Sequence, residues 1–84
     1  MKGKDDIREF VRNLLVTNGD VAPLADQGSL LLSGRLQSID AVEIVVFLEE
    51  NFGINFAEIG FDQERIDSVD AIAVLAQAAS SQSR

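Results

Sequence analysis

The sequence predicts an all-α fold: a small four-helix bundle with three longer helices, one short helix and a long loop between the first two helices. Three segments carry apolar residues at intervals of three and four, which puts those residues on one face of a helix. Each segment starts with residues that favour a helix N-terminus, and the first two end next to a glycine. The 84 residues are expected to form one domain, 1–84, with a small hydrophobic core.

The first helix is expected to run from about Lys4 to Asn18. Asp5 and Asp6 put negative charge in its first turn, which suits the helix dipole, and Gly19 follows its last residues. The apolar residues form one continuous core stripe, so we interpret this helix as structural. The stripe consists of Ile7, Phe10, Val11, Leu14 and Leu15.

A long connection, residues 19–37, follows the first helix and contains Pro23, Gly28 and Gly34. Loops of this length without secondary structure are uncommon in compact domains. The connection is also too rich in leucine for a free linker, so we expect it to pack onto the bundle. The leucines are Leu24, Leu30, Leu31, Leu32 and Leu36.

The second helix is expected from Gln37 to Ile54. Ser38 is expected to cap it by accepting a hydrogen bond from a backbone N–H two or three residues on. Asp40 follows in the first turn, where negative charge suits the dipole, and Gly53 is a stop signal. At about 100° per residue, one side of this helix forms a core stripe. That stripe consists of Ala41, Ile44, Val45, Leu48 and Phe52.

The opposite side of the second helix mixes acidic and apolar residues. A helix with only a structural role would be polar there, so the pattern predicts a docking surface for a partner that is basic and partly apolar. The alternative is a helix buried almost all round. The acids are Glu43 and Glu50, with Asp40 and Glu49 at the edges; the apolar residues are Ile39 and Val46, with Val42 and Phe47 on the flanks.

Two further helices complete the prediction. Apolar residues among acids indicate one short helix near Ala57–Phe61. The last helix is expected to begin near Ser68, capped by Asp67 or by Ser68 itself. The final residues, 80–84, are polar and are expected to fray. The core face of the last helix consists of Val69, Ile72, Ala73, Leu75, Ala76 and Ala79.

The start of the second helix carries a recognisable order of residues. Ser38-Ile39-Asp40 is followed by Val42-Glu43-Ile44-Val45 and then by Glu49-Glu50-Asn51-Phe52. This order resembles the acyl carrier protein family, in which Asp-Ser-Leu-Asp precedes a Val-Glu-Leu-Val-type helix with a Glu-Glu-x-Phe end. The match runs over about seventeen residues without a gap. The resemblance implies an acyl-carrier-type bundle in which Ser38 carries 4′-phosphopantetheine, derived from coenzyme A, through a phosphodiester.

The resemblance also implies a function. It implies a freestanding carrier, not an enzyme, that holds an acyl or aminoacyl group as a thioester and presents it to partner enzymes. The implied partners are a phosphopantetheinyl transferase and acyl- or aminoacyl-loading and acyl-transferring enzymes with basic docking patches. Specialised acyl carriers, including those of lipid biosynthesis, and aminoacyl or D-alanyl carriers stay open as alternatives. The residues expected to contact partners are Ile39, Asp40, Val42, Glu43, Val46, Glu49 and Glu50.

The sequence departs from the family pattern in two places. Gln37 stands where the family has an aspartate that helps the transferase hold its metal ion. The segment 55–64 is about two residues longer than usual and lacks the family's Pro-Asp. Both departures favour a specialised carrier over the housekeeping fatty-acid member. The rival interpretation is an unmodified acidic helical interaction domain, in which Ser38 is only a helix cap.

A second serine has a similar setting. Residues 65–71 echo residues 35–41, and Asp67-Ser68-Val69 has the aspartate that Gln37 replaces. Ser38, however, is followed by the family's helix pattern, whereas Ser68 leads into alanine-rich sequence. We therefore assign the attachment to Ser38 and interpret Ser68 as an N-cap.

Composition excludes several classes of function. The net charge is −7, and no Lys or Arg occurs between Ser38 and Glu64, which is the wrong field for nucleic acid. The chain has no cysteine or histidine, so a thioester needs the thiol of a prosthetic group, and Ser-His catalysis and His metal sites are excluded. No apolar run could span a membrane and no signal peptide is visible, so we expect a cytoplasmic protein. We also expect it to be a monomer and to bind no metal ion.

Overall fold

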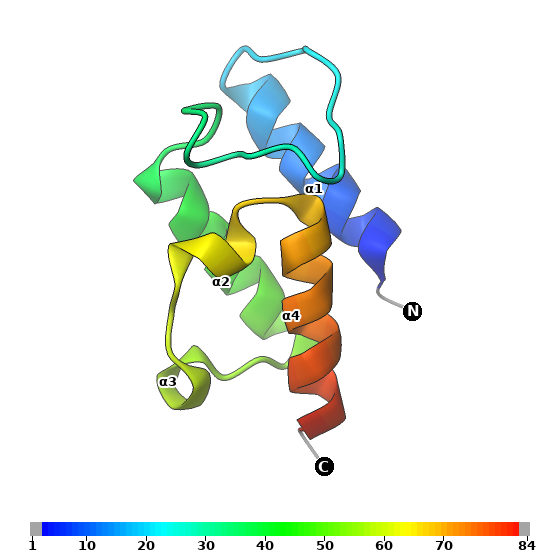
Figure 1. The fold of residues 1–84 in the computed structure, drawn as a ribbon, viewed down its shortest axis with the longest axis vertical. Coiled ribbons are helices and arrows are strands. Elements are labelled where there is room, and N and C mark those ends of the chain that lie inside the picture. The colour runs from blue at the N-terminus through cyan, green and yellow to red at the C-terminus, as the bar shows by residue number, and fades with distance from the viewer. Residues whose placement is uncertain (1–2, 83–84) are drawn as a thin grey trace.

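The computed structural model describes residues 3–82, with side chains up to residue 78. Within this range the chain forms four α-helices, one 3-10 helix and no strand (Figure 1). The small all-α fold with three longer helices and one short helix is therefore confirmed. The 3-10 helix was not expected. The elements are α1 (Lys4–Thr17), α2 (Ser38–Phe52), α3 (Phe56–Ile59), the 3-10 helix η1 (Gln63–Ile66) and α4 (Val69–Gln82).

The helices pack around α4. Helices α1 and α2 both contact α4, and η1 lies against α2 and α4. The long loop between α1 and α2 crosses one end of the molecule, and α3 lies at the other end (Figure 1). The described part measures 38 × 24 × 19 Å along its principal axes. None of the helices in residues 3–82 has both the length and the apolar character needed to cross a lipid bilayer.

The core follows the predicted stripes closely. Four residues expected in it, Phe10, Val45, Phe52 and Ala73, are half-buried at its edge. The Phe10 ring stacks on Phe47 with 4.2 Å between ring centroids, so Phe47 also turns toward the bundle. The buried apolar residues are Ile7, Val11, Leu14, Leu15, Leu30, Leu36, Ala41, Ile44, Leu48, Ile54, Phe56, Ile66, Val69, Ile72, Leu75 and Ala76.

The helix ends agree with most of the predicted signals. The Gly3 N–H donates to the Asp6 carboxylate over 2.9 Å at the start of α1. Gly53 ends α2 with φ of +68°, a left-handed conformation that glycine adopts without steric cost. Ser68 Oγ accepts a hydrogen bond from the Ala71 N–H over 3.0 Å, so its predicted role as the N-cap of α4 is confirmed.

Several boundaries differ from the predictions. Helix α2 ends at Phe52 and not at Ile54, because Gly53 takes a left-handed conformation and ends the helix. Gln37 occupies the N-cap position of α2 and Ser38 is already its first helical residue, so the prediction that Ser38 is the cap is wrong. The short helix is Phe56–Ile59 and not 57–61, because the Asn55 side chain accepts from the Ala57 N–H and starts the helix one residue earlier. Helix α4 continues to Gln82, although fraying was expected from residue 80. Residues 83–84 and the Ala79 side chain lie outside the described part.

The long loop packs onto the bundle as expected, although not with all of its leucines. Leu30 and Leu36 are buried, Leu24 and Leu31 are half-buried, and Leu32 is 87% exposed. Two of these leucines therefore fix the loop in the core, while Leu32 remains at the surface.

Charged side chains also attach this loop to the helices. Arg8 of α1 makes a bidentate pair with Asp26, with N–O distances of 2.8 and 2.7 Å, and Lys4 adds a second ion pair to the same carboxylate. Hydrogen bonds from Arg8 lower the pKa of Asp26 to about 2. Within the loop, Arg35 Nε donates to Asp20 over 2.8 Å, which lowers the pKa of Asp20. One arginine–carboxylate pair thus ties the middle of the loop to α1, and the other joins the two ends of the loop to each other.

Candidate functional site

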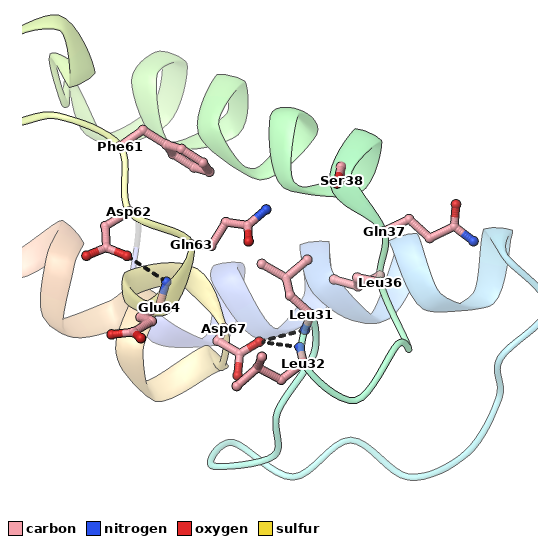
Figure 2. A pocket seen from close by; sticks show the side chains of 10 residues that line it. All are labelled: Leu31, Leu32, Leu36, Gln37, Ser38, Phe61, Asp62, Gln63, Glu64 and Asp67. Atoms are coloured by element: carbon pink, nitrogen blue, oxygen red, sulfur yellow. Dashed lines mark hydrogen bonds between the residues drawn. The ribbon is translucent and has the colours of Figure 1, made fainter.

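Ser38 lies at the edge of a hollow between α2, the long loop and the segment that leads through η1 (Figure 2). The hollow has a volume of about 690 Å³. Leu31 and Leu36 of the long loop line one side, and Phe61 and Gln63 line the other. The Ser38 side chain is exposed, so its hydroxyl can be reached from solvent.

A second, smaller hollow adjoins the first. It has a volume of about 330 Å³ and is lined mainly by apolar residues, with Val42 and Val45 of α2 facing Phe61. Ser38, Phe61 and Gln63 line both hollows. Ser38 therefore stands where two open surfaces meet.

We use the term loop wall for residues 29–36, on the first side of the larger hollow. Asp67 fixes this wall, because its carboxylate accepts from Ser29 Oγ over 2.7 Å, from the Leu31 N–H over 2.6 Å and from the Leu32 N–H over 3.1 Å. Burial by itself raises the pKa of Asp67, but these hydrogen bonds outweigh it and the pKa is lowered. Sequence reasoning considered Asp67 only as a helix cap and missed this anchoring role.

We use the term η1 wall for residues 60–64, on the opposite side. Phe61 is 50% exposed, and its ring meets that of Phe56 edge-on with 6.4 Å between centroids. Asp62 accepts from the Glu64 N–H over 3.0 Å and so caps η1. Sequence reasoning did not assign Phe61 to the site; its position as a lone aromatic between Gly60 and Asp62 was the available signal.

Asp40 does not lie on the outer face of α2. Its side chain is 6% exposed, and its Oδ2 accepts from Asn18 Nδ2 over 3.0 Å and from the Gln37 N–H over 2.9 Å. The prediction that Asp40 contacts a partner from the edge of the outer face is therefore wrong in its placement. The physical reason is that a carboxylate in the first helical turn can bend back to the N–H that precedes the helix.

The other residues that were predicted to contact partners do face outward. Ile39, Val42 and Val46 are 68%, 59% and 43% exposed. The three acids between and beyond them are exposed as well, which rules out a helix buried all round. Those acids are Glu43, Glu49 and Glu50. Phe47, predicted on the flank, is half-buried because it stacks on Phe10.

The charge around this face is negative. Helix α2 contains no basic residue. Lys4, Arg8 and Arg35 make their ion pairs with aspartates outside α2, so these cations do not neutralise its acids. The outer face of α2 therefore presents exposed apolar side chains in a negative electrostatic field.

Within residues 3–82, no group of three or more acidic, histidine or cysteine side chains is arranged to hold a metal ion. Comparisons of the chain with protein-family models, with curated proteins and with solved structures found no match. The function is therefore inferred from the residues and their geometry.

Proposed function

We propose that this protein is a carrier protein in which Ser38 holds 4′-phosphopantetheine. The observation that carries the proposal is the position of Ser38: an exposed hydroxyl on the first residue of a 15-residue helix, between two hollows. The first N–H groups of a helix have no intrahelical acceptor, and the helix dipole favours negative charge beside them. A phosphodiester on Ser38 fits this environment.

The chain has no thiol of its own. When attached, the prosthetic group supplies the thiol on which an acyl or aminoacyl group is held as a thioester. Attachment forms a bond between Ser38 Oγ and the phosphorus of the pantetheine phosphate as the pyrophosphate bond of coenzyme A breaks. Adenosine 3′,5′-bisphosphate leaves, and the serine proton passes to a base on the transferase. The protein contributes an accessible nucleophile in a fixed position.

The outer face of α2 supports recognition by enzymes with basic patches, the transferase and the loading and transferring enzymes. Exposed Glu43, Glu49 and Glu50 steer such partners, and their effect depends on salt. The exposed apolar side chains of Ile39, Val42 and Val46 supply the contacts that slow dissociation. Phe61, which lines the smaller hollow together with Val42, extends this apolar surface.

The carried group and its pathway stay open between acyl, aminoacyl and D-alanyl classes. Gln37, in place of an aspartate, favours a specialised carrier with its own transferase. We propose that the protein acts in the cytoplasm, as a monomer.

The test is incubation with coenzyme A and a broad-specificity phosphopantetheinyl transferase, followed by intact-mass measurement. We expect wild type and Ser68→Ala to gain one phosphopantetheine, and Ser38→Ala to gain none. Ser68→Ala is the matched control because Ser68 also lies at the start of a helix. No modification of wild type by several transferases would overturn the proposal.

The second candidate function is an unmodified acidic interaction domain. The exposed apolar and acidic face of α2 favours it, because such a face can dock a basic partner whether or not Ser38 is modified. This candidate predicts no mass change in any variant and full partner binding by Ser38→Ala.

A further inference from the structure

Asp40 is the one charged side chain in the buried set of the described residues. Its two donors are both neutral: the side-chain amide of Asn18 and the backbone N–H of Gln37. Burial of a carboxylate costs free energy, which hydrogen bonds from neutral groups offset in part. Hydrogen bonds to two separate segments, and not an ion pair, therefore hold this carboxylate in place.

The two donors come from opposite ends of the long loop. Asn18 is fixed in place, because its backbone N–H donates to the carbonyls of Leu14 and Leu15 at the end of α1. Gln37 is the residue before α2, and its N–H lies outside the intrahelical ladder. One oxygen of Asp40 accepts from both, so it links the end of α1 to the start of α2.

Ser38 lies between the two backbone positions that this link fixes, Gln37 and Asp40. We propose that Asn18 and Asp40 form a clamp that positions the Gln37–Ser38 turn for the enzyme that modifies Ser38. The inference rests on the proposed function of Ser38. Asn18 and Asp40 are positioning residues, because they act through the turn and not through contact with the partner.

The clamp makes a prediction that a charge contact does not make. Asp40→Asn removes the charge but keeps an oxygen that can accept both hydrogen bonds. Asp40→Ala removes the acceptor of both hydrogen bonds. Asn18→Ala removes one donor, and because Asn18 is exposed we expect this variant to stay folded. If the turn is correctly placed in only a fraction of the molecules, the apparent affinity falls by that fraction. The clamp variants should therefore raise KM and leave kcat nearly unchanged.

The experiment measures kcat of phosphopantetheine transfer from coenzyme A and the KM of the transferase for this protein, at low and high salt. A second measurement follows amide hydrogen exchange of Gln37 in the absence of the transferase. We expect Asp40→Ala to raise KM about tenfold at both salt concentrations. Asn18→Ala should raise KM less, and Asp40→Asn should stay within about twofold of wild type. Exchange of the Gln37 amide should accelerate only in the two alanine variants. Asn13→Ala, an exposed asparagine of α1, is the control and should match wild type.

Two outcomes would overturn the clamp. In the first, Asp40→Asn raises KM as strongly as Asp40→Ala does, and the increase becomes smaller at high salt. That result would indicate a direct charge contact between Asp40 and the transferase. The other is wild-type KM and wild-type exchange in both alanine variants. Failure of the proposed function is distinguishable: wild type would take up no phosphopantetheine. Exchange of the Gln37 amide would then still decide whether the clamp orders the turn.

Discussion

The two walls of the hollow beside Ser38 are held in different ways. The loop wall is fixed by residues far away in the sequence: Asp67 binds three groups of residues 29–32, and the Leu30 N–H donates to the Asp67 carbonyl over 2.7 Å. In the η1 wall, the Asp62 carboxylate accepts from the Glu64 N–H, only two residues away. Phe61, in the same wall, is half-exposed. The difference indicates that the site has one wall with a fixed geometry and one wall with exposed apolar surface available to a partner.

The largest expected effect comes from breaking the anchor of the loop wall. Asp67→Ala removes three hydrogen bonds to a carboxylate and should lower the free energy of unfolding by about 3 kcal/mol. Asp62→Ala, which removes only the cap of η1, should cost about 1 kcal/mol. Urea unfolding measures both. Equal losses would mean that the two walls are held with similar strength.

The next prediction distinguishes the helix cap at Ser68 from the anchor of the loop wall at Asp67. Ser68 is the neighbour of Asp67, but its hydroxyl accepts only from the Ala71 N–H of its own helix. Ser68→Ala should lower the free energy of unfolding by about 1 kcal/mol while the Leu31 amide stays protected from hydrogen exchange. Faster exchange of Leu31 in Ser68→Ala than in Asp67→Ala would contradict the assignment of Asp67 as the anchor.

The attachment of the long loop to the bundle should also be sensitive to acid. The pKa values of Asp20, Asp26 and Asp67 are all lowered in the folded state, that of Asp26 to about 2. A lowered pKa stabilises the fold above the unfolded pKa of about 4, and that stabilisation is lost as the pH falls through the folded pKa. Unfolding followed between about pH 5 and pH 2 should therefore show a steeper loss in wild type than in Asp26→Asn. Parallel curves would mean that the Arg8–Asp26 pair contributes no pH-dependent stability.

The smallest effect on stability is expected at the η1 wall. Phe61→Ala should cost under about 1 kcal/mol, because half of the side chain is already exposed. It should nevertheless raise the KM of the transferase by several fold, since it removes apolar surface beside Ser38. Val74→Ala, an exposed apolar residue of α4, is the control and should leave KM unchanged. Equal KM values for the two variants would show that partners do not use this wall.

Local patterns predicted the elements that depend on neighbouring residues. The core stripe of α1, the stop at Gly53 and the cap at Ser68 each follow from residues within one or two helical turns, and the structure has all three. The exposure of Ile39 and Val46 likewise follows from the helical period once the core face is known.

Contacts between residues far apart in the sequence could not be predicted from these local patterns. Asp40 looked exposed because its partner, Asn18, lies 22 residues earlier, and Asp67 looked like a cap because its acceptor role depends on residues 29–32. Helix η1 was missed because a single 3-10 turn has no amphipathic repeat to detect. The position of Ser38 at the start of α2 could thus be predicted to within one residue, whereas the contacts that fix its surroundings could not.

The most direct test of the central claim is to locate the added group by peptide mass spectrometry. Trypsin cleaves after lysine and arginine, and residues 36–64 contain neither, so the peptides 36–65 and 66–84 separate Ser38 from Ser68. After incubation with coenzyme A and a transferase, we expect one phosphopantetheine on peptide 36–65, with the fragment ions assigning it to Ser38. Modification of peptide 66–84, or of neither peptide, would contradict the assignment of Ser38 as the carrier residue.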